Sequence, residues 1–313
     1  MKNVVVTGAK GFVGAKLCNE LAKRGYAIFP FSFSQMLAGS AASFPKDVEY
    51  VVHLAARVHI MSDAAVNPMD EYRAVNVAGT IDFARLAAVA GCRRFVFVSS
   101  IKVNGESTLP GQYFTADDNP APQDPYAISK DEAENQLKRL SRETGMEVVI
   151  IRPPLVYGPG VRANFLSLMR LLDRGVPLPF GAIKNHRSFV YLENLIDFII
   201  VCLNHPAAAN DTFLVSDDED LSTPDLLSGL GSALGRPARL IPVPQRVLRA
   251  AAQFFGKQDM ATRLLGSLRI NICKNKEILN WKPSVRVVQG LADTADWYSA
   301  GKRNVPIERL RDG

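Results

Sequence analysis

The chain is poor in cysteine and has no long uninterrupted hydrophobic run. Its four cysteines are scattered over 313 residues without a Cys-x-x-Cys pair, which excludes a disulfide framework and the usual zinc-ligand spacings. We expect them to be buried free thiols in a reducing compartment. The longest apolar stretch, 195–203, contains Asp197 and is far shorter than the ~20 residues of a membrane span. No targeting segment with a cleavage site follows Met1, so we expect a cytoplasmic protein without a membrane partner.

Long basic runs are also missing, although the net charge is +6 and the isoelectric point is near 9.1. The lysines and arginines form no stripe interleaved with aromatic residues, so a nucleic-acid partner is not expected. An anionic small molecule explains the charge more simply. The acidic run Asp217–Asp220 lacks the glycine-spaced loop of a calcium site, so we interpret it as a solvated turn and expect no metal.

Short apolar strands alternate with helical patterns through the first half of the chain. Strands are expected at 3–7, 26–31, 50–55, 95–99 and 147–152, and helices at 12–24, 74–90 and 125–144. This alternation predicts an α/β fold with a doubly wound parallel sheet that is covered on both faces. Residues 153–313 are richer in proline and predict a smaller α/β lobe, with helical patterns at 164–174, 193–204, 223–234 and 244–255. We expect elements near 186–204 to return to the main sheet.

Three glycines follow the first strand, in the pattern G-x-x-G-x-x-G between a strand and a helix. Gly8 permits the tight turn, Gly11 lets the backbone approach a pyrophosphate, and Gly14 lets the helix pack close to the strand. The start of the helix then offers unpaired N–H groups and a partial positive charge to the phosphates. The pattern predicts a dinucleotide site.

The residue that would hold the adenosine ribose is Ser32, where a carboxylate normally ends the second strand. A serine neither grips the two ribose hydroxyls strongly nor repels a 2′-phosphate. NAD and NADP are therefore both open, with NAD slightly favoured.

Tyr126 and Lys130 lie four residues apart in the predicted helix 125–144, and hence on one face. A tyrosine acts as a base near neutral pH only if its pKa of about 10 is strongly lowered. A neighbouring ammonium group and an oxidised nicotinamide would favour the phenolate. Ser100, which follows the preceding strand, can hydrogen-bond the substrate oxygen whose proton moves.

Several further motifs accompany these residues: Thr7–Gly14, His53–Ala56, Asn76, Ser99–Ser100 with Gly105, and Arg152–Pro153 with Tyr157–Gly160. The set resembles the extended short-chain dehydrogenase/reductase family of nucleotide-sugar epimerases, dehydratases and reductases, and the resemblance covers most of the chain. It implies a dinucleotide-binding Rossmann domain over 1–152 and a mainly substrate-binding lobe over 153–313.

The resemblance also implies residue roles. Tyr126 would be the acid/base, Lys130 would bind the nicotinamide ribose and tune the tyrosine, and Ser100 would orient the sugar. The cofactor site would comprise Gly8, Gly11, Phe12, Val13, Gly14, Ser32, Leu54, Ala55, Ala56, Asn76, Tyr126, Lys130 and Pro153.

The family's dehydratases carry an Asp-Glu pair after the active-site Ser or Thr, whereas this chain has Ile101-Lys102. Isoleucine cannot donate a proton, so dehydration is not expected, and C4 epimerisation or C4-ketone reduction is left. The strings 53–61, 99–106 and 151–160 resemble a UDP-glucose-4-epimerase-like subgroup, which is similar to 4-keto-reductases that form UDP-N-acetylquinovosamine. The resemblance implies NAD(P)-dependent redox chemistry at C4 of a UDP-sugar in surface-polysaccharide precursor synthesis.

Four residues are candidates for substrate contact. Asn164 and Arg187 match family positions that bind the diphosphate, for which an arginine donates two parallel hydrogen bonds. A helix N-cap is the alternative for Asn164. Lys102 either contacts the sugar or faces solvent, and His59 lies in a loop that should approach it. Leu155 stands where the family often has Asn, a departure in the nucleotide pocket.

Two alternatives stay open: a reductase of a non-sugar ketone or alcohol on the same scaffold, and a non-catalytic NAD(P)-binding regulatory protein. Asn164 and Arg187 argue against the first, and the set Ser100, Tyr126 and Lys130 argues against the second. The resemblance also implies a homodimer through the helices 74–90 and 125–144.

Overall fold

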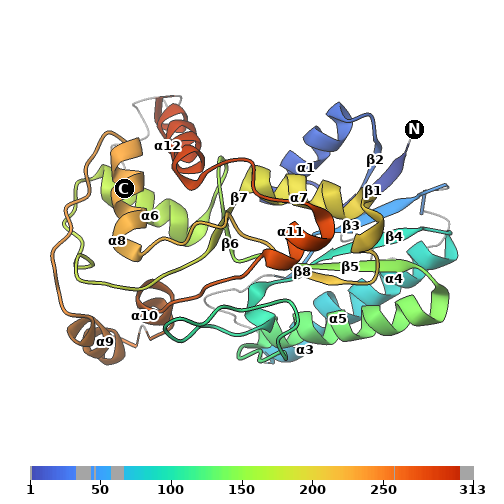
Figure 1. Cartoon of the computed structure of the whole chain (residues 1–313), viewed down its shortest axis with the longest axis horizontal. Coiled ribbons are helices and arrows are strands. Elements are labelled where there is room, and N and C mark those ends of the chain that lie inside the picture. Colours follow the sequence, from blue (N-terminus) through green and yellow to red (C-terminus); the bar gives the residue numbers. More distant parts are fainter. Residues whose placement is uncertain (1, 33–43, 46, 58–66, 257, 304–313) are drawn as a thin grey trace.

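The computed structural model describes residues 2–32, 44–45, 47–57, 67–256 and 258–303 and shows a layered α/β fold (Figure 1). Six parallel strands form its main sheet in the order β2-β1-β3-β4-β5-β8. They are β1 (Asn3–Thr7), β2 (Ala27–Phe31), β3 (Tyr50–His53), β4 (Arg94–Val98), β5 (Glu147–Arg152) and β8 (Thr212–Leu214). The predicted doubly wound parallel sheet is confirmed.

Both faces of this sheet are covered, which explains why its strands are apolar without alternation. In β1, Val4 and Val6 pack toward one layer and Val5 toward the other, and all three are fully buried. Helices α1 (Phe12–Lys23) and α7 (Leu192–Asn204) lie over one face, and α4 (Thr80–Val89) and α5 (Pro125–Thr144) over the other (Figure 1).

The strand order reverses between β1 and β3. The chain runs from β1 outward to β2 and then returns to β3 on the other side of β1, with Thr7 in register with His53. Ligands of doubly wound proteins bind at such a switch point, beyond the carboxyl ends of the strands. The fold therefore directs attention to the ends of β1, β3 and β4.

The helical segment 68–89 is less regular than its sequence predicts. It consists of α3 (Pro68–Tyr72), the π-helical turn η2 (Arg73–Gly79) and α4. Wide π turns occur often at functional sites, and hydrophobic spacing does not reveal them. Helix α5 matches its predicted bounds, because Asp124 caps its first turn through the Ala127 N–H and Gly145 ends it in the left-handed conformation.

The second lobe has its own hydrophobic core, with Tyr157, Phe165 and Leu227 among its buried residues. It contains the parallel pair β6 (Leu155–Tyr157) and β7 (Phe189–Tyr191) and the following helices: α6 (Ala163–Asp173), α8 (Thr223–Ala233), α9 (Gln245–Phe254), α10 (Gln258–Leu265) and α12 (Val287–Arg303). Shorter helical segments are η3 (Ile101–Val103), η4 (Pro206–Ala208) and α11 (Cys273–Leu279).

Two elements beyond residue 152 lie on the main sheet. Helix α7 lies beside α1, where Lys16 donates to Glu193 over 2.7 Å, and β8 extends the sheet beyond β5. The division of the chain at residue 152 into cofactor and substrate domains stays a prediction.

All four cysteines are free. Cys92 and Cys202 are buried and Cys18 is half-buried, but Cys273 is exposed, so the expectation of buried thiols is wrong for Cys273. Within the described ranges, no helix combines the length and the hydropathy that a membrane crossing requires. The apolar stretch 195–203 lies in α7 and is almost entirely buried.

Candidate active site at the strand ends

The glycine loop forms a narrow turn between β1 and α1. Gly8 has a φ of +68°, and a Cβ at this position would lie 3.0 Å from the backbone nitrogen of Ala55. A Cβ on Gly14 would collide with the carbonyl oxygen of Gly8. Gly11 is the N-cap of α1 and provides no side-chain cap, so the first N–H groups of the helix point to a ligand position. The turn fits the pyrophosphate of a dinucleotide.

A cavity of about 300 Å³ opens beside this helix start. The glycine loop lines one side of it, with Phe12, and Pro159, Gly160 and Arg162 of the second lobe line the other. The left-handed Gly160 would bring a Cβ to 3.4 Å from the Phe12 ring. The end of the motif Tyr157–Gly160 therefore lies against the start of α1.

A buried chain of hydrogen bonds fixes the switch point. The Thr7 hydroxyl accepts from the backbone N–H groups of the first two residues of the segment 54–56 and lies 3.1 Å from Nδ1 of His53. His53 Nε2 is 3.1 Å from the hydroxyl of Thr80. Burial, and then the charge of Lys130, lower the pKa of His53 to about 3, so the imidazole is neutral. The predicted cofactor residues 54–56 are held half-buried at this edge.

Asn76 lies in the π-helical turn behind the same segment and is 1% exposed. Its side-chain oxygen accepts from the Arg57 backbone nitrogen at 2.8 Å, and its amide nitrogen donates to the Arg57 carbonyl and to the Ser129 hydroxyl. The geometry gives Asn76 a positioning role that links the segment after β3 to α5. Direct contact with a cofactor stays a prediction.

Tyr126 lies in the first turn of α5, and its hydroxyl is hydrogen-bonded to Ser100, which follows β4. Burial raises the pKa of Tyr126, the carboxylate of Asp124 raises it further, and the bond with Ser100 lowers it. The chain by itself therefore keeps the phenol protonated at neutral pH. Proton removal requires an added positive charge, which a bound nicotinamide cation supplies.

Lys130 lies one turn further along α5 and is 2% exposed. Its Nζ donates to the carbonyl oxygen of Val98 at 3.0 Å and lies 4.4 Å from the centroid of the Phe97 ring. Burial lowers the pKa of Lys130 to about 7, against the opposing effect of Glu134. The structure thus brings the three predicted catalytic residues together at the end of β4, and their roles stay predictions.

A buried ion pair lies beneath this face of α5. Both carboxylate oxygens of Glu134 accept from Arg152, whose Nη2 is 2.5 Å from Oε2, and Ser99 donates to Oε1 at 2.6 Å. Arg152 also donates to the side chain of Asn104 at 2.9 Å. Sequence reasoning missed Glu134, although its position four residues after Lys130 on the same helical face was a usable signal.

Lys102 is largely shielded from bulk solvent and forms two ion pairs. Its Nζ donates to Glu106 at 2.7 Å and to Asp124 at 2.5 Å, and all three side chains are about one-fifth exposed. Because Asp124 caps the helix that carries Tyr126, Lys102 ties η3 to the start of α5. Sugar contact by Lys102 stays a prediction and would add to this tie.

Arg187 occupies a junction between distant segments. It forms isolated backbone bridges with Leu221 and Leu268, and its Nη1 donates to the carbonyl of Gly266 at 3.1 Å. Burial lowers the pKa of Arg187 to about 10, while nearby Arg263 lowers it further and Glu106 raises it. The guanidinium stays charged at neutral pH, as binding of a diphosphate requires.

Asn164 is exposed in the first turn of α6, whose N-cap is Arg162. The N-cap alternative for Asn164 is therefore wrong.

The other predicted site residues lie in different places. Pro153 is buried, and its carbonyl accepts from the Ile101 nitrogen at 3.0 Å. Ser32 is exposed just beyond β2, and His59 lies outside the described residues.

The acidic run 217–220 is not a solvated turn throughout, because Asp217 is 2% exposed. Asp217 accepts from the Tyr191 backbone nitrogen and from the side chains of Asn194 and Tyr157, while burial raises its pKa to about 6. Its three neighbours each bond a different basic residue. Among the described residues, no three His, Cys, Asp or Glu side chains are grouped to hold a metal.

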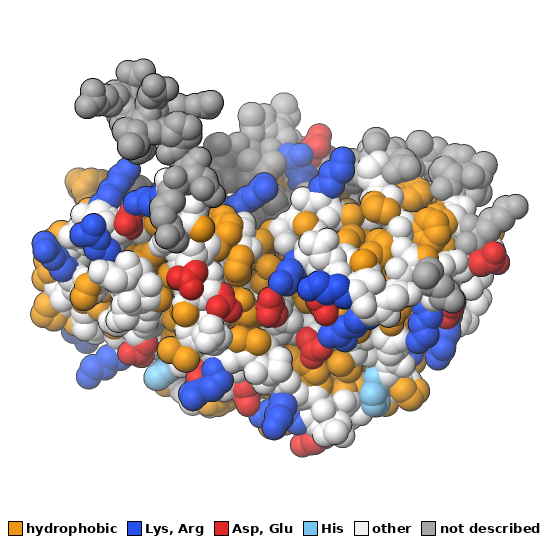
Figure 2. Space-filling model, turned by 90° about the horizontal axis from the view of Figure 1, so that it is seen from above, with side chains coloured by type: hydrophobic (Ala, Val, Ile, Leu, Met, Phe, Trp, Pro, Cys, Tyr) orange, Lys and Arg blue, Asp and Glu red, His pale blue; other side chains and the backbone are white. Residues whose placement is uncertain are grey.

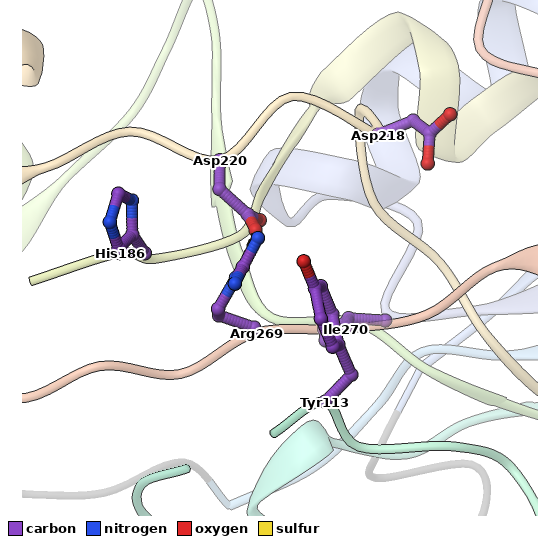
Figure 3. Close-up of a pocket in the computed structure, with 6 residues that line it drawn as sticks. All are labelled: Tyr113, His186, Asp218, Asp220, Arg269 and Ile270. Atoms are coloured by element: carbon purple, nitrogen blue, oxygen red, sulfur yellow. Dashed lines mark hydrogen bonds and ion pairs between the residues drawn. The ribbon is translucent and has the colours of Figure 1, made fainter. Parts of the chain in front are cut away.

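A polar pocket of about 290 Å³ lies elsewhere on the second lobe. In Figure 3, Arg269 extends to Asp220 beside the ring of Tyr113, at 2.7 Å from the carboxylate and 3.9 Å from the ring centroid. Asp220 also accepts from Ser188. Because these charged groups satisfy one another and include none of the predicted site residues, we locate the candidate chemistry at the strand ends.

Comparisons with known proteins give a matching family and a similar relative. Residues 4–216 match the NAD dependent epimerase/dehydratase family. The chain is 45% identical to a UDP-glucose 4-epimerase of Vibrio cholerae over an alignment of 313 residues that covers 95% of each protein.

Two solved structures have the same fold. One is a UDP-glucose 4-epimerase from Thermotoga maritima with UDP-glucose, with a TM-score of 0.77, 20% identity, and coverage of 96% of this chain and 99% of that one. The other is RMD from Pseudomonas aeruginosa with NADPH, with a TM-score of 0.76, 22% identity, and coverage of 96% and 100%.

Proposed function

This chain belongs to the NAD-dependent epimerase/dehydratase family, and from that premise we propose that it inverts the C4 hydroxyl of a UDP-hexose. It is an NAD(P)-dependent enzyme of the extended short-chain dehydrogenase type, as its motifs predicted. The observation that carries the proposal is the placement of Tyr126 and Lys130 one helical turn apart on α5, with Ser100 beside the phenol and the Lys130 ammonium on the carbonyl of Val98 at the end of β4.

In the proposed reaction, the Tyr126 oxygen takes the proton of the sugar's C4 hydroxyl and returns it after the ketosugar has turned over. A bound nicotinamide would supply reversible hydride transfer at C4. Ser100 would donate a hydrogen bond to the C4 oxygen, and the protonated form of Lys130 would stabilise the phenolate. The phenol of Tyr126 is half-buried and the ammonium of Lys130 is buried, so both are largely shielded from bulk water.

Substrate recognition is proposed for the second lobe. The guanidinium of Arg187 and the exposed amide of Asn164 would bind the diphosphate. Ile101 stands where dehydratases carry an acid, and it is 4% exposed, which supports epimerisation over loss of water. The 45% identity to a UDP-glucose 4-epimerase supports a UDP-linked hexose as substrate.

One experiment distinguishes the proposed epimerase activity from the alternative, reduction of a C4 ketone. Purified protein is denatured to release and identify any bound nicotinamide coenzyme, and intact protein is assayed with UDP-glucose, UDP-N-acetylglucosamine and a UDP-4-keto-6-deoxy sugar. We expect turnover of a UDP-hexose without added NAD(P)H. Stoichiometric consumption of NAD(P)H with the keto sugar alone would overturn the epimerase assignment.

We further infer a cytoplasmic role in supplying surface-polysaccharide precursors, by a homodimer that pairs α4 and α5 with their copies. The exposed residues of α5, such as Arg139 and Arg142, would lie at or near this interface. Light scattering on the purified protein tests the dimer, and a monomeric mass at micromolar concentration would exclude it.

A further inference from the structure

Helix α9 is amphipathic, yet none of its residues is buried. Its apolar side chains recur at helical spacing, as in Val247, Ala251 and Phe254, and therefore share one face. Arg249 lies on the opposite face, and Arg246 flanks the apolar face about 100° around the helix axis. A helix with this pattern normally hides its apolar face in the core, so the face on α9 requires another explanation.

The exposure is large and local. Phe254 is 84% exposed, Phe255 is 69% exposed and Val247 is 55% exposed, with Ile241 at 50% and Met260 at 48% just outside the helix. Five of the 13 exposed large hydrophobic residues in the described part of the chain thus come from the stretch 241–260. Contiguous exposed apolar surface of this kind marks an interaction site.

The same region has an excess of basic over acidic residues. Residues 226–265 contain six Lys and Arg but one acidic residue, so this segment accounts for five of the six net positive charges of the chain. On the face seen in Figure 2, by contrast, Lys and Arg side chains are mixed with Asp and Glu. An anionic partner is therefore favoured at α9.

We propose that α9 and its neighbour α10 bind the surface of a membrane that contains anionic lipid. Phe254, Phe255 and Val247 enter the boundary between headgroups and acyl chains, while Arg246 and Arg249 lie at the level of the phosphates. A helix of ten residues is about 15 Å long, so it lies on a bilayer and does not cross it.

The positive charge near α9 and the position of this helix favour an anionic membrane over a protein as its partner. An apolar face alone suits either, but exposed arginines beside and opposite exposed apolar side chains are the pattern of interfacial membrane helices. Helix α9 also lies at the outer edge of the second lobe, away from the main sheet (Figure 1). The inference departs from the sequence expectation of no membrane partner, because hydropathy windows detect spanning segments and not interfacial ones.

Sedimentation of the full-length protein with vesicles tests the proposal. We expect binding to phosphatidylcholine vesicles that contain phosphatidylglycerol, weaker binding to phosphatidylcholine alone, and loss of binding as the salt concentration rises. Phe254→Ser with Phe255→Ser should weaken binding by at least about tenfold, since two buried rings are lost. Arg246→Gln with Arg249→Gln should weaken binding to the anionic vesicles by about tenfold.

Matched variants control for general surface effects. Val288→Ser removes an apolar side chain that is 70% exposed on α12, and Arg139→Gln with Arg142→Gln removes two exposed arginines at the same spacing on α5. Because those two arginines lie near the proposed dimer interface, Arg170→Gln with Arg174→Gln, at exposed positions at the end of α6, serves as a second charge control. All of these controls should leave the vesicle binding of each protomer unchanged. Phe254→Trp should keep binding and shift its emission to shorter wavelength when anionic vesicles are added.

Three outcomes would overturn the proposal: no binding to anionic vesicles, equal binding by the double phenylalanine variant, or equal loss in the matched controls. A concentration-dependent self-association that the double phenylalanine variant abolishes, without vesicle binding, would instead assign this face to a second copy of the chain. Thermal unfolding of each variant shows that it is folded.

Discussion

Helix α5 buries the ammonium of Lys130 and the carboxylate of Glu134, whereas α9 leaves the rings of Phe254 and Phe255 exposed. These two charged groups each have a bonding partner from another element, at Val98 for the lysine and at Arg152 for the glutamate. On α9 the apolar groups have little to pack against. Polarity alone therefore does not decide burial in this molecule, and α5 should be intolerant of substitution where α9 is tolerant.

The largest expected effect is on the chemistry of α5. Tyr126→Phe should lower kcat by about 10²- to 10⁴-fold, because the acid/base oxygen is lost while the ring that packs beside Tyr72 is kept. Steady-state epimerase kinetics measure this. Tyr113→Phe, which alters a tyrosine whose ring lies against Arg269, should leave kcat close to that of the wild type. Comparable rates for the two variants would remove Tyr126 from the mechanism.

The next effect is on stability. Arg152→Met leaves the carboxylate of Glu134 buried without its ion partner and should lower the free energy of unfolding by about 3–5 kcal/mol. Arg73→Met breaks an exposed pair with Glu132 and should cost about 1 kcal/mol or less. Urea unfolding of the cofactor-free protein measures both. Equal losses would show that burial of the Arg152–Glu134 pair does not increase its contribution to the free energy of unfolding.

A pH dependence should distinguish Lys130 from an exposed lysine. Burial lowers its pKa in the folded chain to about 7 from 10.5, so below pH 7 both states are charged and the folded state bears the full cost of the buried charge. Between pH 7 and 10.5 the folded lysine is neutral, and this cost falls as pH rises. The stability advantage of Lys130→Met over the wild type should therefore be greatest below pH 7 and shrink by a few kcal/mol toward pH 10.

That measurement uses the cofactor-free protein, unfolded by urea at a series of pH values. Lys138→Met, on the exposed side of α5, serves as the control and should show no such trend. A difference between Lys130→Met and the wild type that is constant across the range would mean that the ammonium is not desolvated.

The smallest expected effect is on α9. Phe254→Ser with Phe255→Ser should change the free energy of unfolding by no more than about 0.5 kcal/mol, since exposed side chains contribute little to the folded state. Thermal and urea unfolding measure it. A loss above about 2 kcal/mol would mean that these rings are covered in the folded protein and that the contrast with α5 is false.

Local signals predicted α5 and the glycine loop well. The bounds 125–144 follow from a cap at Asp124, a proline in the first turn and a glycine just after the end. The loop requires glycine at positions 8 and 14 because any Cβ there meets backbone. The prediction of a solvated turn was wrong for Asp217, and the solvent-facing alternative for Lys102 missed its ion pairs. Asp124 and the partners of Asp217 are distant in the chain, so no local pattern indicates them.

The sequence by itself determined the parallel α/β fold, the cofactor loop and the face that carries Tyr126 and Lys130, since turn chemistry, caps and hydrophobic period act within a few residues. Only the tertiary structure decided which charges are buried in pairs and which apolar face of a helix is left exposed. The bridges from Arg187 to Leu221 and to Leu268 join segments that are distant in the chain. Such contacts depend on the packing of whole elements, which no local pattern encodes.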